Sequence, residues 1–269
     1  MTSLTKNNYT DIDYTAENIR DYVDKAIVAF KDSKRDLKHF VEHIISEYIL
    51  SYNFLDLVYD YEIFRESLRY ICIPVNNKQI LYIQKYIPIV SIETSLDISD
   101  KTFVHLTDLE RINAMGEDCK ITDEVLLSLP KLKELNLASN NKITDKAVSK
   151  LTNLEVLSLS GNSKITDVAL SNLTKLKELN ISNSLITDKS LSKLTSLEIL
   201  IVSNNLNITD ASVSNLVNLK KLNATKSINI TDSSVSNLLQ LKELYISENP
   251  NITTKSISKL TLTKLFPKK

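Results

Sequence analysis

The stretch NNKITDKAVSKLTNLEVLSLSGNSKITDVAL, from Asn140 to Leu170, contains the triplet Ile-Thr-Asp twice, beginning at Ile143 and again at Ile165. Variants of the triplet begin at Ile98 and Ile252. The complete copies recur every ~22 residues, with slips of one, and begin at Ile121, Ile143, Ile165, Ile186, Ile208 and Ile230. Self-similarity at a fixed period of this length is the sequence signature of stacked repeats.

A second pattern precedes each triplet. Leu132, Leu135 and Leu137 are followed by Asn140, in the spacing L-x-x-L-x-L-x-x-N. Leu135 and Leu137 alternate as the buried face of a short strand requires. An asparagine where the chain leaves the strand can bond backbone groups that no sheet satisfies. We therefore predict a structural role for the asparagines that end the clear copies: Asn140, Asn162, Asn205 and Asn249.

The triplet itself predicts a short helical turn. In this interpretation Ile143 is buried, and Thr144 or Asp145 caps the turn through a side-chain oxygen. No single repeat can bury its own apolar face, so the copies must stack into a curved solenoid with strands on the concave side. We expect an α/β solenoid of about eight repeats of ~22 residues over 87–269.

These patterns resemble leucine-rich repeats. The phrase ITDxxLxxL is similar to the cysteine-containing, RNI-like class found in F-box substrate receptors and some bacterial effectors, although asparagine or serine replaces its cysteines. The repeat length, and the phrase LSNLTKLKELNIS at 170–182, also resemble internalin repeats. Internalins, however, place the next apolar residue four positions after the aspartate, and here it follows after three. The resemblance implies the fold and leaves the partner open.

Residues 1–86 differ from the repeats, because they are rich in aromatic residues with helical periodicity. We expect four helices, near Ile19–Phe30, Leu37–Ile49, Phe54–Ile71 and Lys78–Tyr86. The main role predicted for this segment is an all-helical N-terminal domain that caps the first repeat, since solenoids need their ends shielded.

One stretch of this segment offers an alternative. ILSYNFLDLVYDYEIFRESLRYI, from Ile49 to Ile71, is similar to the F-box phrase, although the usual Leu-Pro opening and the tryptophan are absent. The matching positions are Ser51, Tyr52, Asp56, Leu57 and Phe64. This resemblance implies an F-box-type adaptor that feeds a bound protein to a cullin ubiquitin ligase.

Composition excludes several functional classes. With only two glycines, the chain cannot contain a P-loop, a dinucleotide fingerprint or a nucleophile elbow. Lys+Arg and Asp+Glu are equal at 33 each, which argues against nucleic acid as a partner. Residues 1–8 lack the apolar segment of a signal peptide, and no apolar run approaches the ~18 residues of a membrane span. We therefore expect a cytoplasmic protein that does not act on membranes, and read both cysteines, Cys72 and Cys119, as reduced thiols.

The segment HFVEH, from His39 to His43, matches an inverted zinc-protease phrase. Projected on a helix, both histidines lie opposite the apolar side and lack a third ligand, so we interpret them as solvated. We expect no metal, no cofactor and no enzymatic activity.

The remaining prediction is a protein-binding surface on the concave face. Alternate strand residues point to opposite faces, so those flanking the buried leucines face the concave side. Ile199, Ile201 and Tyr245 are the apolar and aromatic exceptions on a polar surface, as interfaces require. The predicted partner-binding residues are Glu134, Asn136, Val156, Ser158, Glu178, Asn180, Ile199, Ile201, Lys221, Asn223, Glu243 and Tyr245.

Overall fold

The computed structural model describes residues 19–30, 32, 33, 35, 39–41, 43, 44, 61–71, 77–85, 88–93 and 98–266. The chain divides after Ile98 into two compact units, 1–98 and 99–269. The boundary at residue 86 drawn from the repeat pattern stays a prediction. Strand β2 (Ser91–Glu93) pairs in parallel with β1 (Tyr70–Ile71) of the same unit.

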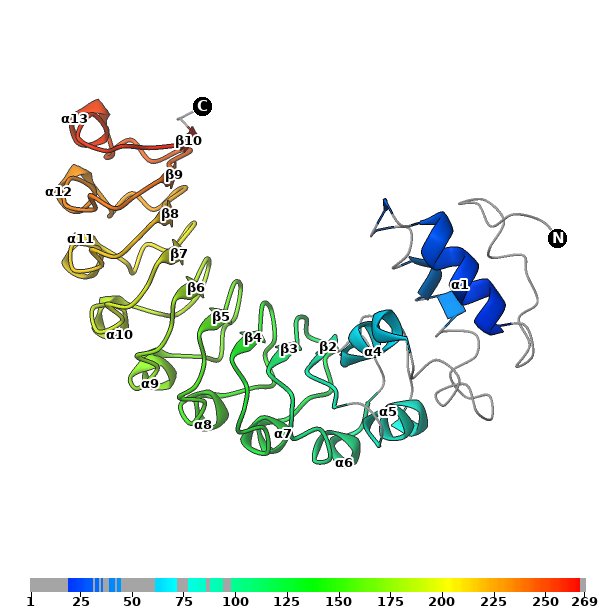
Figure 1. The fold of residues 1–269 in the computed structure, drawn as a ribbon. Helices are drawn as coiled ribbons and strands as arrows, with labels where there is room; N and C mark the ends of the chain where they lie inside the picture. The colour runs from blue at the N-terminus through cyan, green and yellow to red at the C-terminus, as the bar shows by residue number, and fades with distance from the viewer. Residues whose placement is uncertain are drawn as a thin grey trace. The chain divides into compact units, whose positions relative to one another are not determined.

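The first unit contains the helices α1 (Ile19–Ala29), α4 (Glu62–Arg69) and α5 (Asn77–Gln84), labelled in Figure 1. Their apolar faces are buried as the periodicity predicted, for example Val23 in α1 and Phe64 in α4. One part of the all-helical prediction is wrong, because Tyr70 and Ile71 form β1 instead of ending a helix. An aromatic and a β-branched residue both favour the pleated conformation. The start of that predicted helix, at Phe54, lies outside the described residues.

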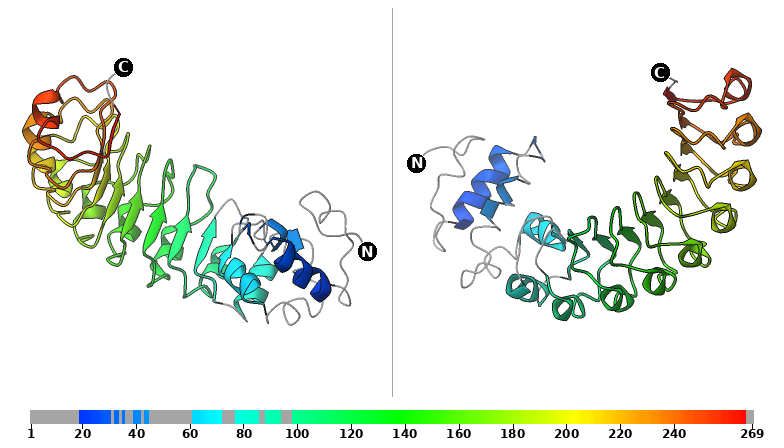
Figure 2. Two further views of the ribbon diagram at one scale, coloured as in Figure 1. Left: turned by 45° about the horizontal axis from the view of Figure 1, so that its top comes forward. Right: turned by 180° about the vertical axis from the view of Figure 1, so that it is seen from behind.

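The second unit is the predicted solenoid. Its strands are β3 (Arg111–Asn113), β4 (Glu134–Asn136), β5 (Val156–Ser158), β6 (Glu178–Asn180), β7 (Ile199–Ile201), β8 (Lys221–Asn223), β9 (Glu243–Tyr245) and β10 (Lys264–Phe266). Each strand pairs in parallel with the next one, and equivalent residues of neighbouring repeats lie opposite one another. The helices are α6 (Asp100–Phe103), α7 (Asp123–Leu127), α8 (Asp145–Val148), α9 (Asp167–Leu170), α10 (Asp188–Leu191), α11 (Asp210–Val213), α12 (Asp232–Val235) and α13 (Thr254–Ile257). Within this unit the strands line the inner side of an arc and the helices its outer side (Figures 1 and 2).

The core of the solenoid lies between the sheet and the outer helices. The central residue of each strand from β3 to β9 is buried, and the two residues beside it are more accessible. The isoleucine of each triplet and the leucine before each strand are buried in the same layer, as Ile165 and Leu176 illustrate. Because the repeats are in register, the same position is buried in turn after turn.

The predicted asparagine ladder is present, and Asn140, Asn162, Asn205 and Asn249 are all buried. The Asn162 side-chain amide donates to the carbonyl oxygens of Leu137 (3.2 Å) and Asn140. Its amide oxygen accepts from the backbone N–H groups of Lys164 (2.9 Å) and Ile165 (2.9 Å). The asparagine thus closes the turn of its own repeat and joins it to the preceding one.

Two repeats use serine at this position. Ser184 donates its hydroxyl to the carbonyl oxygen of Ile181 (2.9 Å), and Ser227 donates to that of Val202 (2.6 Å). Serine can therefore replace part of the asparagine's bonding with a single hydroxyl.

The Ile-Thr-Asp triplet forms a second ladder along the outer helices. Thr209 caps its own helix by accepting from the Ala211 N–H (3.1 Å). Thr209 also donates its N–H (3.0 Å) and its hydroxyl (2.6 Å) to Asp188 in the preceding repeat. The threonine is thus the helix cap, and the aspartate binds the threonine of the following repeat. The other pairs of this ladder are Asp100–Thr122, Asp123–Thr144, Asp145–Thr166, Asp167–Thr187, Asp210–Thr231 and Asp232–Thr253.

The aspartate–threonine ladder makes the folding stability depend on pH. Partial burial raises the pKa of Asp167, Asp210 and Asp232, but hydrogen bonds from the serine and threonine of the next repeat outweigh it, so each pKa lies below its usual range. Since an unfolded aspartate titrates near ~3.9, the unfolded chain binds more protons at low pH. The stabilisation is therefore complete above about pH 5 and is lost as the pH falls through the folded pKa values.

We expect the urea midpoint to fall between pH 5 and pH 3. The variant Asp210→Asn, measured over the same range, should show a shallower decline because one of these carboxylates is gone. An equal decline in both proteins would contradict this role of the ladder.

Candidate protein-binding surface

The twelve residues predicted to bind a partner lie at the first and third positions of β4 to β9. The strand register places them in two rows across the sheet. Figure 2 shows from two directions that the strands of this unit lie on the side opposite the helices. All twelve are half-buried, whereas the residue between each pair is buried. The sequence therefore located these residues correctly in the fold, while their role in binding stays a prediction.

Three of the twelve have a structural function as well. The side-chain oxygens of Asn136, Asn180 and Asn223 accept the backbone N–H two residues later, at 3.0, 3.1 and 3.1 Å. Such a bond stabilises the turn that follows the strand. These asparagines shape the rim of the surface, and we assign the binding energy to other residues.

The apolar part of the surface begins on β7. Ile199 lies opposite Glu178 on one side and Lys221 on the other, and Ile201 lies between Asn180 and Asn223. Both isoleucines are half-buried between polar neighbours. The neighbouring side chains thus cover part of each isoleucine and leave the rest accessible on the concave face.

The aromatic part lies two strands further on. The Tyr245 ring stacks on Phe266 of β10, with ring centroids 4.3 Å apart and planes inclined by 8°. The Lys221 ammonium lies 5.6 Å from the Tyr245 ring centroid, and the Tyr245 hydroxyl donates to Glu243 (3.2 Å). Phe266 remains 45% exposed. The sequence analysis missed Phe266, although its place at the end of a further L-x-x-L-x-L-like copy could have located it.

A row of charges borders the sheet where each strand begins. The residues immediately before the strands alternate in sign and are Glu110, Lys133, Glu155, Lys177, Glu198 and Lys220, followed by Lys242. Ion pairs join Lys133 to Glu110 (3.0 Å), Lys177 to Glu155 (2.7 Å) and Lys220 to Glu198 (2.7 Å). This row was also missed, although its alternation at the repeat period is legible in the sequence.

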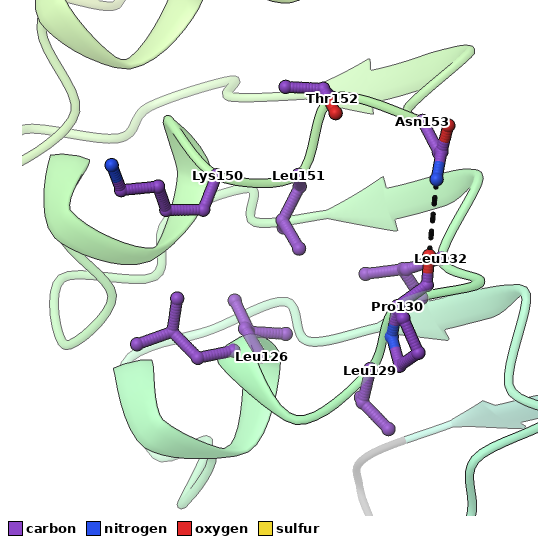
Figure 3. Close-up of a pocket in the computed structure, with 9 residues that line it drawn as sticks. Leu126, Leu129, Pro130, Leu132, Lys150, Leu151, Thr152 and Asn153 are labelled. Carbon is purple, nitrogen blue, oxygen red and sulfur yellow. Dashed lines mark hydrogen bonds between the residues drawn. The ribbon is translucent and has the colours of Figure 1, made fainter.

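A pocket of about 280 Å³ lies away from the concave surface, between two successive repeats (Figure 3). Leu126, Leu129 and Leu151 contribute apolar side chains, and Asn153 donates to the carbonyl oxygen of Pro130 (3.2 Å). Among the described residues that line it there is no carboxylate, imidazole or thiol. The ionisable side chain among its lining residues is that of Lys150.

The structure describes part of the HFVEH segment, which resembles a zinc-protease motif. His39 is exposed and His43 half-buried, while Phe40, Val41 and Ile44 between and beside them are buried. Within the described part of the chain no three His, Cys, Asp or Glu side chains are grouped to hold a metal ion. Cys119 is buried and forms no disulfide with another described residue, and Cys72 lies outside the described residues.

Among the described helices, none combines the length and apolar character needed to span a bilayer.

Comparison with known proteins agrees with the fold. Residues 128–151 match the family description "Leucine Rich repeat", and 152–194 match "Leucine Rich repeats (2 copies)". No curated protein matches the sequence. The chain is a leucine-rich-repeat protein, as the repeat pattern predicted, and the membership of the F-box class stays a prediction.

Several solved structures are similar to this chain. One is an internalin, InlF, from Listeria monocytogenes, with 21% identity over 85% of this chain and 91% of that one, at a TM-score of 0.47. Another is yeast Rad7, solved with Elc1, with 18% identity over 70% and 71% of the two chains and a TM-score of 0.42. A third is TLR13 in complex with ssRNA13, with 24% identity over 72% of this chain at a TM-score of 0.45. This chain spans 27% of the length of that TLR13 chain. None of these similarities bears on what this chain binds.

Proposed function

We propose that the protein is a non-enzymatic module that binds a protein partner on the concave face of its repeats. The observation that carries this proposal is the placement of Ile199, Ile201 and Tyr245 among positions that, apart from Val156, are polar from β4 to β9. Apolar and aromatic side chains ringed by polar ones concentrate binding energy at protein interfaces. Leucine-rich repeats commonly act as interaction scaffolds, and a curved sheet offers an extended binding surface.

The geometry supports a binding site centred on β7 to β9. Ile201 and Tyr245 occupy the same register position two strands apart, and adjacent strands lie ~4.8 Å apart. The two side chains therefore start roughly 10 Å from one another. A single extended segment of a partner can contact both.

A display selection tests this proposal without a known partner. Random dodecapeptides are selected on the wild-type protein and then on the double variant Ile201→Asp/Tyr245→Ala. We expect the peptides enriched on the wild type to be lost on the double variant. If they are retained, or if no peptide is enriched, the concave site is wrong.

The adaptor alternative rests on the similarity of 49–71 to the F-box phrase. Of its five matching positions, Phe64 lies in the described residues and is buried, and the other four lie outside them. It stays a prediction from the sequence. Co-purification of a cullin adaptor with the full chain from its native cell, and its loss on truncation of residues 1–86, would support it.

A further inference from the structure

We infer that the end of the concave face formed by β9 and β10 binds an acidic peptide segment with an aromatic or large aliphatic side chain. This inference rests on the proposed function and adds the chemistry of the partner. It is carried by a break in the charge alternation, beside the exposed aromatic stack of Tyr245 and Phe266.

The break occurs at Lys242. By the alternation of the preceding repeats, the residue after Lys220 in this row should be a glutamate, but it is a second lysine. Lys220 is already paired with Glu198 (2.7 Å). The next equivalent position is Thr263, which is uncharged. Within the described part of the chain, no carboxylate forms an ion pair with Lys242, and its side chain is exposed.

The neighbouring charges do not compensate for Lys242. Glu243 is shared by Lys264 (2.7 Å) and Lys221 (3.8 Å). The hydrogen bond from Lys264 is the main reason that the pKa of Glu243 lies below its usual range, so it remains ionised. Three lysines, at 221, 242 and 264, therefore face one glutamate. The surplus is local, because the chain as a whole is neutral.

The aromatic stack indicates the apolar side chain of the ligand. Lys221 and Phe266 approach the Tyr245 ring from β8 and β10, the strands on either side of β9, and Phe266 is the more exposed of the two rings. A half-exposed ring next to a surplus of lysines suits an apolar side chain that is flanked by carboxylates. Apolar contact supplies binding energy, and the complementary charges supply orientation and specificity.

The positions of Lys242 and Tyr245 also limit the spacing of the ligand. Lys242 lies immediately before β9 and Tyr245 ends that strand, so their Cα atoms are roughly 10 Å apart. We therefore expect the acidic residue and the aromatic or large aliphatic residue to lie within a few positions of one another in the peptide.

A peptide fits this surface better than a nucleic acid. Glu243 lies between Lys221 and Lys264 and would repel a phosphate backbone. Nucleic-acid surfaces need a continuous basic patch to neutralise successive phosphates. The row of alternating glutamates that borders the sheet interrupts any such patch.

The test compares wild type with Lys242→Glu. This change restores the alternation next to Lys220, so its melting temperature should not fall. The control is Lys193→Glu, an equal change of charge at an exposed position after α10. Random dodecapeptides are selected on all three proteins, and the preferred wild-type peptide is synthesised together with a version in which lysine replaces each acidic residue.

We expect wild type and Lys193→Glu to enrich peptides with an acidic residue within a few positions of an aromatic or large aliphatic one. Lys242→Glu should bind the synthetic peptide at least tenfold more weakly and should bind its lysine version more tightly than wild type does. A merely structural effect would not reverse this preference. If Lys242→Glu is less stable, Lys242→Gln repeats the test without introducing a charge.

Two results would overturn the inference while leaving the proposed function intact. One is the enrichment of neutral or basic peptides that depend on Ile201 and Tyr245. The other is an unchanged preference in Lys242→Glu. Salt-sensitive binding of a fluorescent oligothymidine that competes with the peptides would also overturn it and indicate nucleic acid instead. By contrast, if the selection yields no peptide whose binding depends on Ile201 and Tyr245, the proposed function itself is contradicted.

Discussion

The variant Asn162→Ala should lower the free energy of unfolding by about 2–3 kcal/mol, because it leaves buried backbone groups without partners. Asn162 is 1% exposed and makes four hydrogen bonds to backbone atoms. The Leu137 carbonyl keeps a second donor, the Asn140 N–H (3.1 Å). The groups left unpaired are the Asn140 carbonyl and the N–H groups of Lys164 and Ile165. Chemical denaturation of wild type and variant measures the difference.

Two further variants make this prediction specific. Asn162→Ser should destabilise the protein less than Asn162→Ala does. Ser184 and Ser227 occupy the equivalent position in their own repeats and donate hydrogen bonds to backbone carbonyls there. Asn141→Ala, at the adjacent and more accessible residue, should change stability by no more than about 0.5 kcal/mol. If Asn162→Ala costs no more than Asn141→Ala, the asparagine ladder does not hold the repeats together.

The second large effect concerns binding. Ile201→Asp and Tyr245→Ala should each weaken the binding of the selected peptide by about 2 kcal/mol, which is a roughly thirtyfold loss of affinity. Ile201→Asp places a carboxylate where a partner's apolar side chain would lie, and Tyr245→Ala removes the ring that stacks on Phe266. Fluorescence anisotropy titrations measure both affinities.

The matched control for these variants lies on the flank of the same repeats. Ile228 is 42% exposed but lies outside the strands. Ile228→Asp should leave the affinity nearly unchanged, and circular dichroism should show the same spectrum for all variants. Equal losses in Ile201→Asp and Ile228→Asp would indicate a general effect of the added charge.

Much of the solenoid could be predicted from the sequence, because its contacts repeat at one period. Leu135 and Leu137 revealed the strand, and Ile143 with Thr144 revealed the capped helix. The partner of Asp145 could not be found in the same way. It is Thr166 of the next repeat, and that pairing depends on how adjacent repeats are aligned in space.

The first unit was less predictable for a related reason. Tyr70 and Ile71 continue the helical pattern of α4 locally, but they pair with Ser91 and Ile92, about twenty residues away. A strand of two residues is too short to show the alternation of apolar and polar residues that reveals a strand in a sequence. Phe266 was missed for a different reason: it lies in a further, weaker copy of the repeat pattern, whose strand β10 aligns it with Tyr245.

The most direct test of concave-face binding is a methyl NMR titration of isoleucine-labelled protein with the selected peptide. Ile199 and Ile201 report on the concave face, and Ile228, which is 42% exposed, reports on the flank. Binding on the concave face predicts saturable shifts of the Ile199 and Ile201 methyl signals, with Ile228 unchanged. Shifts at Ile228 with Ile199 and Ile201 unmoved would contradict it.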